Sequence, residues 1–308
     1  MPAALEFQST SKHFGAHAAL DSLSLTLERG EILGFLGPNG AGKTTAIHLA
    51  LGFLRPTEGG GVILGRPFGD TATRARIGFL PDSPSFFAGS ANAAVELAGR
   101  LNNTRNPRLR ERSRELLSQL NLASAGKDAR RFSRGLQQRL GMAQALVNDP
   151  DLLILDEPTS ALDPPGVLEV RELLKAARSE GKSIFFSSHQ LSEVEQVCDR
   201  IAFLDHGRLL RHGPLASFLE DSGRMEVVIQ GLPADAEAML QYQQFHSGSS
   251  EAGQHFVIPA HMQREFIEQI WAAGGTLKSV TPLRRTLEEL FIAWSEDASE
   301  NASRKPEA

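Results

Sequence analysis

The stretch that most constrains this chain runs from Ile32 to Thr45 and reads ILGFLGPNGAGKTT. Its opening residues form a short apolar run, as expected for a buried strand of a parallel sheet. The residues from Thr44 to Leu51 follow a helical pattern. The segment between strand and helix reads GPNGAGKT and matches the pattern G-x-x-x-x-G-K-[ST] in full. A chance glycine-rich turn rarely lies between a strand and a helix, so we interpret the segment as a phosphate-binding loop.

The composition of this loop suits a triphosphate. Gly37, Gly40 and Gly42 allow tight curvature without a Cβ clash, so that backbone N–H groups can turn inward. The loop leads into a helix N-terminus, where unpaired N–H groups and the helix dipole favour anions. Lys43 would neutralise the β- and γ-phosphates, and the Thr44 hydroxyl would ligate Mg²⁺. The expected nucleotide-binding residues of the loop are Gly37, Pro38, Asn39, Gly40, Ala41, Gly42, Lys43, Thr44 and Thr45.

The overall composition indicates a soluble globular protein. The length of 308 residues suggests about two domains, and 41% hydrophobic with 22% charged residues is ordinary for a chain with a real core. The net charge of −5 gives no cue for nucleic acid or an anionic membrane. The single cysteine, Cys198, excludes an intramolecular disulfide, fits a reducing cytoplasm and is expected to be buried. We expect neither a signal peptide nor a membrane-spanning segment, since no apolar run is long enough.

Two adjacent carboxylates, Asp156 and Glu157, end the apolar run that starts at Leu152. Successive strand residues point to opposite sides, so the two acids can serve different roles. Acids at the end of a buried strand are costly unless a cation or a reaction partner is present. We therefore expect Asp156 to bind Mg²⁺ and Glu157 to act on the attacking water. The alternative is that both acids are simply solvated at the strand end.

His189 ends another apolar run, which starts at Ile184. Ligands of α/β sheets sit at the carboxyl ends of the strands, so His189 would share an edge with the loop and the acids and reach the γ-phosphate. A lone histidine is otherwise most often a satisfied polar residue. Ser133 is a good N-cap for a further helix, and Gly135 keeps the approach to that helix open. This second helix N-terminus is also suited to a phosphate.

The rest of the chain divides into a core and a small C-terminal region. Short strands are expected within 1–36, 62–64 and 77–82, helices within 91–121, and a hairpin over 201–210. The helical stretch interleaves arginines with glutamates, which is typical of a solvated helix face, with a docking surface as the alternative. These arginines are Arg105, Arg108, Arg110, Arg112 and Arg114.

A break near 220–224 precedes the C-terminal region, in which no chemical motif is visible. Its expected strands are 225–229, 256–258 and 276–280, and its expected helices are 234–240, 262–271 and 287–294. The loop 243–254 and the tail 295–308 are polar, and we expect both to be mobile.

Taken in order, these motifs resemble those of the ATP-binding subunit of ABC transporters over residues 5 to about 220. The resemblance implies an α/β P-loop NTPase of the ABC type, with a mixed core sheet and a helical subdomain at about 83–140. The first domain would span 1–220, and a small α+β accessory domain would span 225–294. The segment 132–139 resembles the family signature, and 160–163 its D-loop. Phe14, whose position alone favours a core residue, falls where the family stacks adenine on an aromatic ring.

Two departures from the family pattern stand out. The signature reads FSRGL, which keeps Ser133 and Gly135 but has Arg134 and Leu136 where the family has Gly and Gln. Asp82 stands where the family usually has Gln, and would still contact Mg²⁺ or its water. Such substitutions, and the ending 286–291, resemble the branch that drives exporter-type permeases.

The resemblance implies a mechanism and partners. Two subunits would pair head to tail, with Ser133 and Gly135 of one capping the γ-phosphate held by the other. Lys43, Glu157 and His189 would be the catalytic residues, with ATP and Mg²⁺ as cofactors. The partners would be an integral-membrane permease, docked on 83–140, and a second copy or a paralogous ATPase subunit. The expected location is the cytoplasmic face of the cell membrane, with no nucleic acid bound.

The sequence alone also allows two other functions. One is a soluble ABC-type ATPase that works on ribosomes or DNA; the single cassette and the lack of a heptad insert argue against it. The other is a regulatory nucleotide-binding module with little turnover, which Asp82 and the altered signature allow. The acids at 156 and 157 and His189 argue against that module. The cargo is not encoded here, because its contacts would lie in the permease.

Overall fold

A computed structural model describes residues 2–101, 108–123, 128–219, 221–232, 243–292 and 294. The chain forms two compact units. The first comprises the chain up to Leu215 together with Trp294, and the second comprises 216–293. Each unit has a hydrophobic core of its own.

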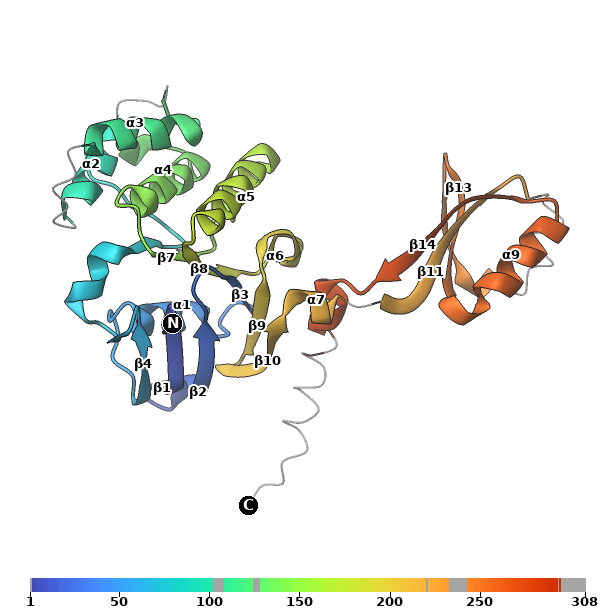
Figure 1. The fold of residues 1–308 in the computed structure, drawn as a ribbon, viewed down its shortest axis with the longest axis horizontal. Coiled ribbons are helices and arrows are strands. Elements are labelled where there is room, and N and C mark those ends of the chain that lie inside the picture. Colours follow the sequence, from blue (N-terminus) through green and yellow to red (C-terminus); the bar gives the residue numbers. More distant parts are fainter. Residues whose placement is uncertain are drawn as a thin grey trace, which may run out of the picture. The chain divides into compact units, whose positions relative to one another are not determined.

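A six-stranded sheet forms the centre of the first unit (Figure 1). The strand order is β10-β9-β3-β8-β7-β6, and all neighbours run parallel except the hairpin partners β9 and β10. Every residue of β3, β7 and β8 is buried, as expected for strands covered on both faces. The mixed core sheet expected from the sequence is thereby confirmed. The strands are β3 (Ile32–Leu36), β6 (Ile77–Leu80), β7 (Leu152–Asp156), β8 (Ser183–Ser188), β9 (Arg200–Asp205) and β10 (Arg208–Pro214).

An antiparallel sheet of order β2-β1-β4-β5 accompanies the core sheet. Its strands are β1 (Leu5–Phe14), β2 (His17–Leu27), β4 (Glu58–Ile63) and β5 (Arg66–Pro67). The first two strands are 10 and 11 residues long, so the expectation of short strands here is wrong. They are long because they pair with each other as one hairpin from Leu5 to Leu27. Helix α1 (Lys43–Ala50) buries Ala46, Ile47, Leu49 and Ala50 in the core shared by both sheets.

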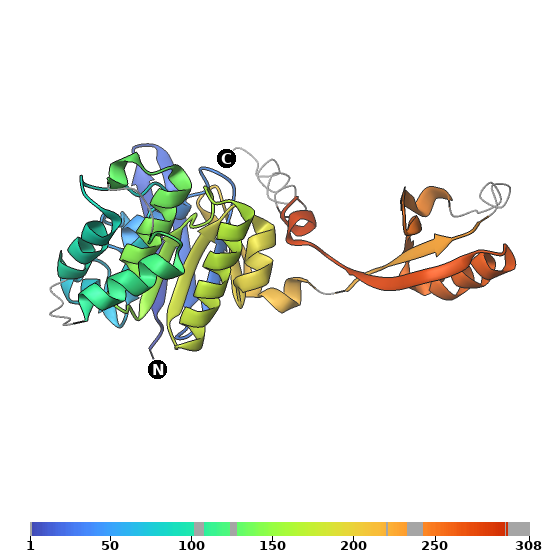
Figure 2. The ribbon, with the colours of Figure 1, turned by 90° about the horizontal axis from the view of Figure 1, so that it is seen from above.

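The helical part of the first unit consists of α2 (Ala91–Leu101), α3 (Leu109–Gln119) and α4 (Arg134–Leu146), which contact one another (Figure 1). Helix α4 also contacts β6 closely: a Cβ at Gly78 would lie 2.1 Å from the carbonyl oxygen of Ala145. In Figure 2 the green to yellow-green helices α4 and α5 (Pro164–Ser179) lie side by side along the core sheet. On α3, Arg110 and Arg114 are exposed, in agreement with a solvated face, while Arg105 lies outside the described residues.

The described part of the chain also contains shorter helices. They are α6 (Leu191–Val197), α7 (Leu215–Phe218), and the 3₁₀ helices η1 (Thr71–Arg76), η2 (Ala129–Arg131), η3 (Gln243–Phe245) and η4 (Ala260–Met262). The expected burial of Cys198 is confirmed, and burial raises the pKa of its thiol.

The second unit is an antiparallel sheet of order β12-β13-β11-β14 with helix α9 (Gln263–Ala272) on one face. Its strands are β11 (Asp221–Gln230), β12 (His246–Ser250), β13 (Gly253–Pro259) and β14 (Thr276–Arg284). Residues 287–292 are helical as expected. The expected helix 234–240 and the tail 295–308 lie outside the described residues.

One expectation for this unit is wrong. The segment 243–254, expected as a mobile loop, contains β12, which pairs with β13. Backbone hydrogen bonds between the two strands stabilise this segment, so its polar side chains leave no apolar alternation in the sequence. The break expected at 220–224 lies a few residues beyond the division between the two units, and β11 begins within it, at Asp221.

The core of the first unit predicts a test of stability. Phe185 is 1% exposed, and its ring centroid lies 5.0 Å from that of Phe35. Replacing Phe185 by Ala should destabilise this unit by about 3–5 kcal/mol, since a cavity would remain. The matched control is Phe87→Ala, at a ring that is 79% exposed, with an expected change within about 0.5 kcal/mol. Urea unfolding followed by circular dichroism measures both, and equal effects would contradict this view of the core.

Candidate active site

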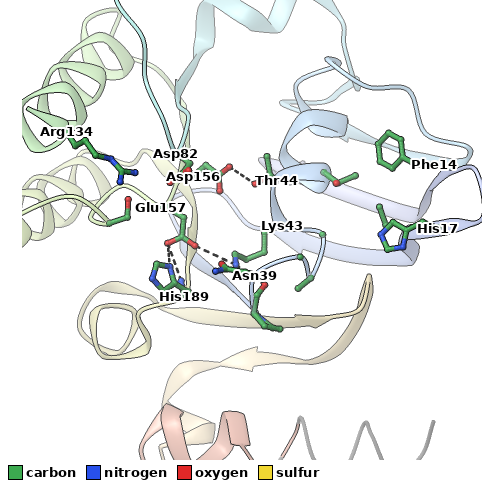
Figure 3. Close-up of a pocket in the computed structure, with 17 residues that line it drawn as sticks. Phe14, His17, Asn39, Lys43, Thr44, Asp82, Arg134, Asp156, Glu157 and His189 are labelled. Carbon is green, nitrogen blue, oxygen red and sulfur yellow. Dashed lines mark hydrogen bonds and ion pairs between the residues drawn. The ribbon is translucent and has the colours of Figure 1, made fainter. Parts of the chain in front are cut away.

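The carboxyl ends of the parallel strands bring the chemical motifs to one edge of the core sheet. The loop 37–42 follows β3, Glu157 follows β7, His189 follows β8, and Asp82 lies shortly after β6. These segments line a pocket of about 580 Å³ (Figure 3). The expected site residues that line it are Phe14, Pro38, Asn39, Gly40, Ala41, Gly42, Lys43, Thr44, Thr45, Asp82, Asp156, Glu157 and His189.

Glycine is required at specific positions of the loop. Gly42 precedes α1 with φ +108°, a conformation that side chains rarely adopt. A Cβ on Gly42 would also lie 2.4 Å from the carbonyl oxygen of Ala19. A Cβ on Gly37 would lie 2.2 Å from the carbonyl oxygen of Leu204. The loop therefore lies directly against neighbouring backbone, and its N–H groups lead into the N-terminus of α1.

Lys43 is held at the mouth of the loop. Its side chain is 7% exposed, and Nζ donates hydrogen bonds to the carbonyl oxygens of Gly37 at 2.7 Å and Pro38 at 3.3 Å. Nζ also lies 3.6 Å from Oε1 of Glu157. The buried positive charge is thus balanced by a carboxylate and by loop carbonyls, which a phosphate can replace as partners.

Asp156 and Thr44 form an oxygen-rich pair deep in the pocket. The hydroxyl of Thr44 donates to Oδ2 of Asp156 at 2.9 Å, and the hydroxyl of Ser187 donates to Oδ1 at 2.5 Å. Within the described ranges no group of three or more His, Cys, Asp or Glu side chains is arranged to hold a metal alone. One hydroxyl and one carboxylate nevertheless fit Mg²⁺, which prefers oxygen ligands and takes the remainder from water and phosphate.

Glu157 is held by both its backbone and its side chain. It is not glycine, yet its φ is +50°, a strained conformation that persists only where the surroundings enforce it. Its N–H donates to the carbonyl oxygen of Ser187 at 3.1 Å, and its carbonyl accepts from Nε2 of Gln138 at 3.0 Å. Its Oε2 lies 2.7 Å from Nδ1 of His189 and accepts the His189 N–H at 3.3 Å. The carboxylate is therefore held between Lys43 and His189 (Figure 3).

Two side chains with aromatic rings lie at the other end of the pocket. Figure 3 shows Phe14 and His17 on the side away from Glu157 and His189. Phe14 is 49% exposed, so the interpretation as a core residue, drawn from its position alone, is wrong. The ring is exposed because β1 ends there, and Nζ of Lys12 lies 5.2 Å from its centroid. Sequence reasoning missed His17, although it pairs with Phe14 across the turn between β1 and β2.

Three expected residues, Gly37, Ser133 and Gly135, do not line this pocket in their own chain. Ser133 caps α4, its hydroxyl accepting from the N–H of Leu136 at 3.3 Å, and the expected N-cap is confirmed. A Cβ on Gly135 would lie 2.9 Å from the carbonyl oxygen of Ala161, so the start of α4 lies against the loop 157–163. Arg134, between them, does line the pocket (Figure 3). In the sequence, Arg134 was marked only by its charge, at a position where the family signature has glycine.

This geometry defines a class of protein. A glycine-rich loop with its lysine, a strand that ends in two acids, and a histidine on the next strand surround one pocket, as in P-loop nucleotide hydrolases. The sequence model of the family described as "ABC transporter" matches residues 20–160.

Comparison with known proteins identifies the family. The chain is 38% identical over 283 residues to an uncharacterized ABC transporter ATP-binding protein of Synechocystis, covering 89% of this chain and 77% of the relative. It is 33% identical over 295 residues to the bacitracin transport ATP-binding protein of Bacillus licheniformis, covering 92% and 94%. The chain belongs to the family of ABC transporter ATP-binding proteins.

Solved structures agree with this assignment. The ATP-binding subunit of an ABC transporter matches with a TM-score of 0.66 and 27% identity, over 70% of this chain and 91% of that one. A dimeric ATP-binding cassette in a post-hydrolysis state with ADP and phosphate matches with a TM-score of 0.63 and 26% identity, over 68% and 98%. The fold is that of an ABC ATPase cassette, which binds and hydrolyses nucleotide. Cassettes of this family dimerise and typically work with a membrane permease.

The site predicts the effect of removing its lysine. Lys43→Ala should weaken ATP binding at least about 30-fold, because a buried charge that faces the phosphates is lost. The control is Lys175→Ala, at an exposed lysine on α5 that pairs only with Glu172 among the contacts described. Titration with a fluorescent ATP analogue, alongside thermal unfolding to show that the variant is folded, measures the effect. An unchanged affinity would contradict the role of Lys43.

Proposed function

We propose that this protein is the ATP-hydrolysing subunit of an exporter, and that it powers a separate permease through head-to-tail dimerisation at the cytoplasmic face of the membrane. The observation that carries the hydrolytic part is the Glu157 carboxylate, 2.7 Å from His189 and 3.6 Å from Lys43 in the pocket of the phosphate loop. Relatives named for export support the transport part: a Nod factor export ATP-binding protein of Cupriavidus metallidurans is 35% identical over 235 residues. Among the described residues, no helix is long and apolar enough to cross a membrane.

The pocket offers a place for each part of ATP. The adenine stacks on Phe14, whose ring is half-exposed at one end of the pocket. The triphosphate lies on the N–H groups of the loop 37–45, with Lys43 against the β- and γ-phosphates. Thr44 and Asp156, with Asp82 nearby, would hold Mg²⁺, which would neutralise charge on the phosphates.

Hydrolysis follows from the position of Glu157. The carboxylate takes a proton from water as the water oxygen bonds to the γ-phosphorus and the bond to the β-γ bridging oxygen breaks. ADP and phosphate are the products. His189, bonded through Nδ1 to Glu157, steadies the base and keeps Nε2 for the γ-phosphate. The strained backbone at Glu157 supports this assignment, since such strain gathers at functional sites.

The pocket is completed by a second subunit. Ser133 and Gly135 do not line the pocket of their own chain, which supports a role at the γ-phosphate of a partner. The partner is a second copy or a paralogous ATPase subunit, and the similar cassette with ADP and phosphate is dimeric. ATP then favours the closed dimer, and hydrolysis releases it.

The remaining parts have proposed roles as well. Residues 1–220 form the ATPase domain, and its helical subdomain at about 83–140 docks the permease. Residues 225–294 form an accessory domain. Three large apolar side chains of the helical subdomain, Phe87, Leu97 and Leu101, are exposed, and we take this exposed apolar surface as support for docking there.

Replacing the proposed base separates binding from turnover. Glu157→Gln should lower turnover at least about 100-fold while ATP still binds, because the amide cannot accept the proton. The variant should accumulate as an ATP-dependent dimer, since the step that opens the dimer is blocked. Phosphate release and light scattering coupled to gel filtration, with and without ATP, measure both effects. Glu172→Gln, at an exposed acid on α5, is the control. Wild-type turnover in Glu157→Gln would show that another group is the base.

The transport role predicts a membrane partner. Purification of the tagged protein from gently solubilised native membranes should recover a multi-span membrane protein together with it. Identification of the co-purified proteins by mass spectrometry is the measurement, with the tag alone as the control. Recovery only with ribosomes or DNA-bound proteins would contradict transport and favour a soluble ABC-type ATPase.

A further inference from the structure

The loop that follows Glu157 has a second attachment inside the protein. Thr159 is 6% exposed, and its hydroxyl donates a hydrogen bond to Oε2 of Glu193 on α6. Glu193 is itself 7% exposed. The bond therefore lies in the interior, where water has little access to either side chain. An interior bond of this kind limits the positions that the loop can take.

A buried acid at this position is costly. Desolvation is the main cause that raises the pKa of Glu193. The hydroxyl of Thr159 and the guanidinium of Arg171 on α5 act in the opposite direction. Of the two catalytic groups nearby, Glu157 raises this pKa and His189 lowers it. An apolar side chain would avoid the cost of burial, so the presence of Glu193 points to function more than to stability.

The attachment joins the two segments that carry the catalytic pair. His189 lies just before α6, and Glu193 lies within that helix. His189 contacts Glu157 at the start of the loop 157–163, and Glu193 contacts Thr159 two positions further along. The loop 157–163 and the segment of His189 and α6 are thus joined by two side-chain contacts, one at the pocket and one outside it. A movement of α6 relative to the loop would disturb both contacts together.

The loop also reaches the rest of the site. Ser160 lines the nucleotide pocket, and the carbonyl oxygen of Ala161 lies against Gly135 at the start of α4. Turns closed by the N–H of Ser160 to Glu157 and of Leu162 to Thr159 make the segment compact. A restraint on Thr159 therefore acts on its neighbours on both sides.

We propose that Glu193 is a positioning residue for ATP hydrolysis, which through its hydrogen bond to Thr159 holds the loop 157–163 so that the Glu157 carboxylate stays against His189. This inference deepens the function proposed for the same site and rests on the role of Glu157 as the base. Glu193 does not touch the nucleotide pocket, and it contributes by restricting where Glu157 can lie.

Matched pairs of variants separate the loss of this hydrogen bond from a loss of stability. Thr159→Val removes the donor with little change in volume, and Glu193→Ala removes the acceptor. Thr159→Ser keeps the hydroxyl, and Glu193→Gln keeps an oxygen that can accept from it. Gln196→Ala is the matched control, since Gln196 is an exposed residue of the same helix.

The test compares kcat and KM for ATP in the full-length protein, at a temperature below every thermal transition. Thr159→Val and Glu193→Ala should each lower kcat about 10- to 100-fold, since a catalytic group displaced by about 1 Å loses that much, with KM within about twofold. The kcat of the double variant should equal that of the slower single variant, because all three variants lack the same hydrogen bond. Thr159→Ser, Glu193→Gln and Gln196→Ala should stay within about threefold of wild type.

Three results would overturn the inference. A lower thermal transition with wild-type kcat would make the bond structural only. Losses that multiply in the double variant would show that the two residues act separately. A raised KM with unchanged kcat would place the effect on binding. Glu157→Gln is measured in parallel: loss of its turnover keeps the proposed function intact even when the Glu193 inference fails, whereas retained turnover contradicts both.

Discussion

The parallel pairing of β3, β8 and β7 is the constraint on which the rest of this structure depends. The register places Leu36 beside Ser188 and Asp156 beside Ser187. Whatever follows these residues in the chain must therefore emerge at the same edge of the sheet. The phosphate loop, Glu157 and His189 are distant in the sequence, and this pairing alone brings them together.

The surrounding structure then enforces an arrangement that costs energy. Lys43 and Asp156 are buried charges, and Glu157 has a strained backbone. Each is compensated nearby: Lys43 by carbonyls and Glu157, Asp156 by the hydroxyls of Thr44 and Ser187. The strands behind the site are fully buried, and the free energy gained from this apolar burial offsets these costs. The interior bond between Thr159 and Glu193 belongs to the same set of restraints.

The departures from the family pattern acquire a position in this structure. Asp82 and Arg134 both line the nucleotide pocket, although Asp82 follows β6 and Arg134 begins α4. A carboxylate and a guanidinium group of one chain thus line the same pocket.

The sequence by itself determined the chemistry of this site. Motifs that depend on close spacing, such as the loop with Lys43 and Thr44, the acids Asp156 and Glu157, and the cap at Ser133, could be read directly because covalent geometry holds their residues together. The order of strands and helices in the first unit could be read in the same way from apolar runs. Strand β12 could not, because its residues His246–Ser250 are polar or glycine and leave no apolar pattern, although its partner β13 contains the expected strand 256–258.

Only the tertiary structure decided which distant residues meet. Position alone could not show that Phe14 lies at an exposed strand end, nor that His17 and Arg134 line the same pocket. The bond between Thr159 and Glu193 spans 34 positions, and no local spacing predicts it. The physical reason is that local propensity acts over a few residues, whereas the pairing of strands and the burial of charges depend on the whole fold.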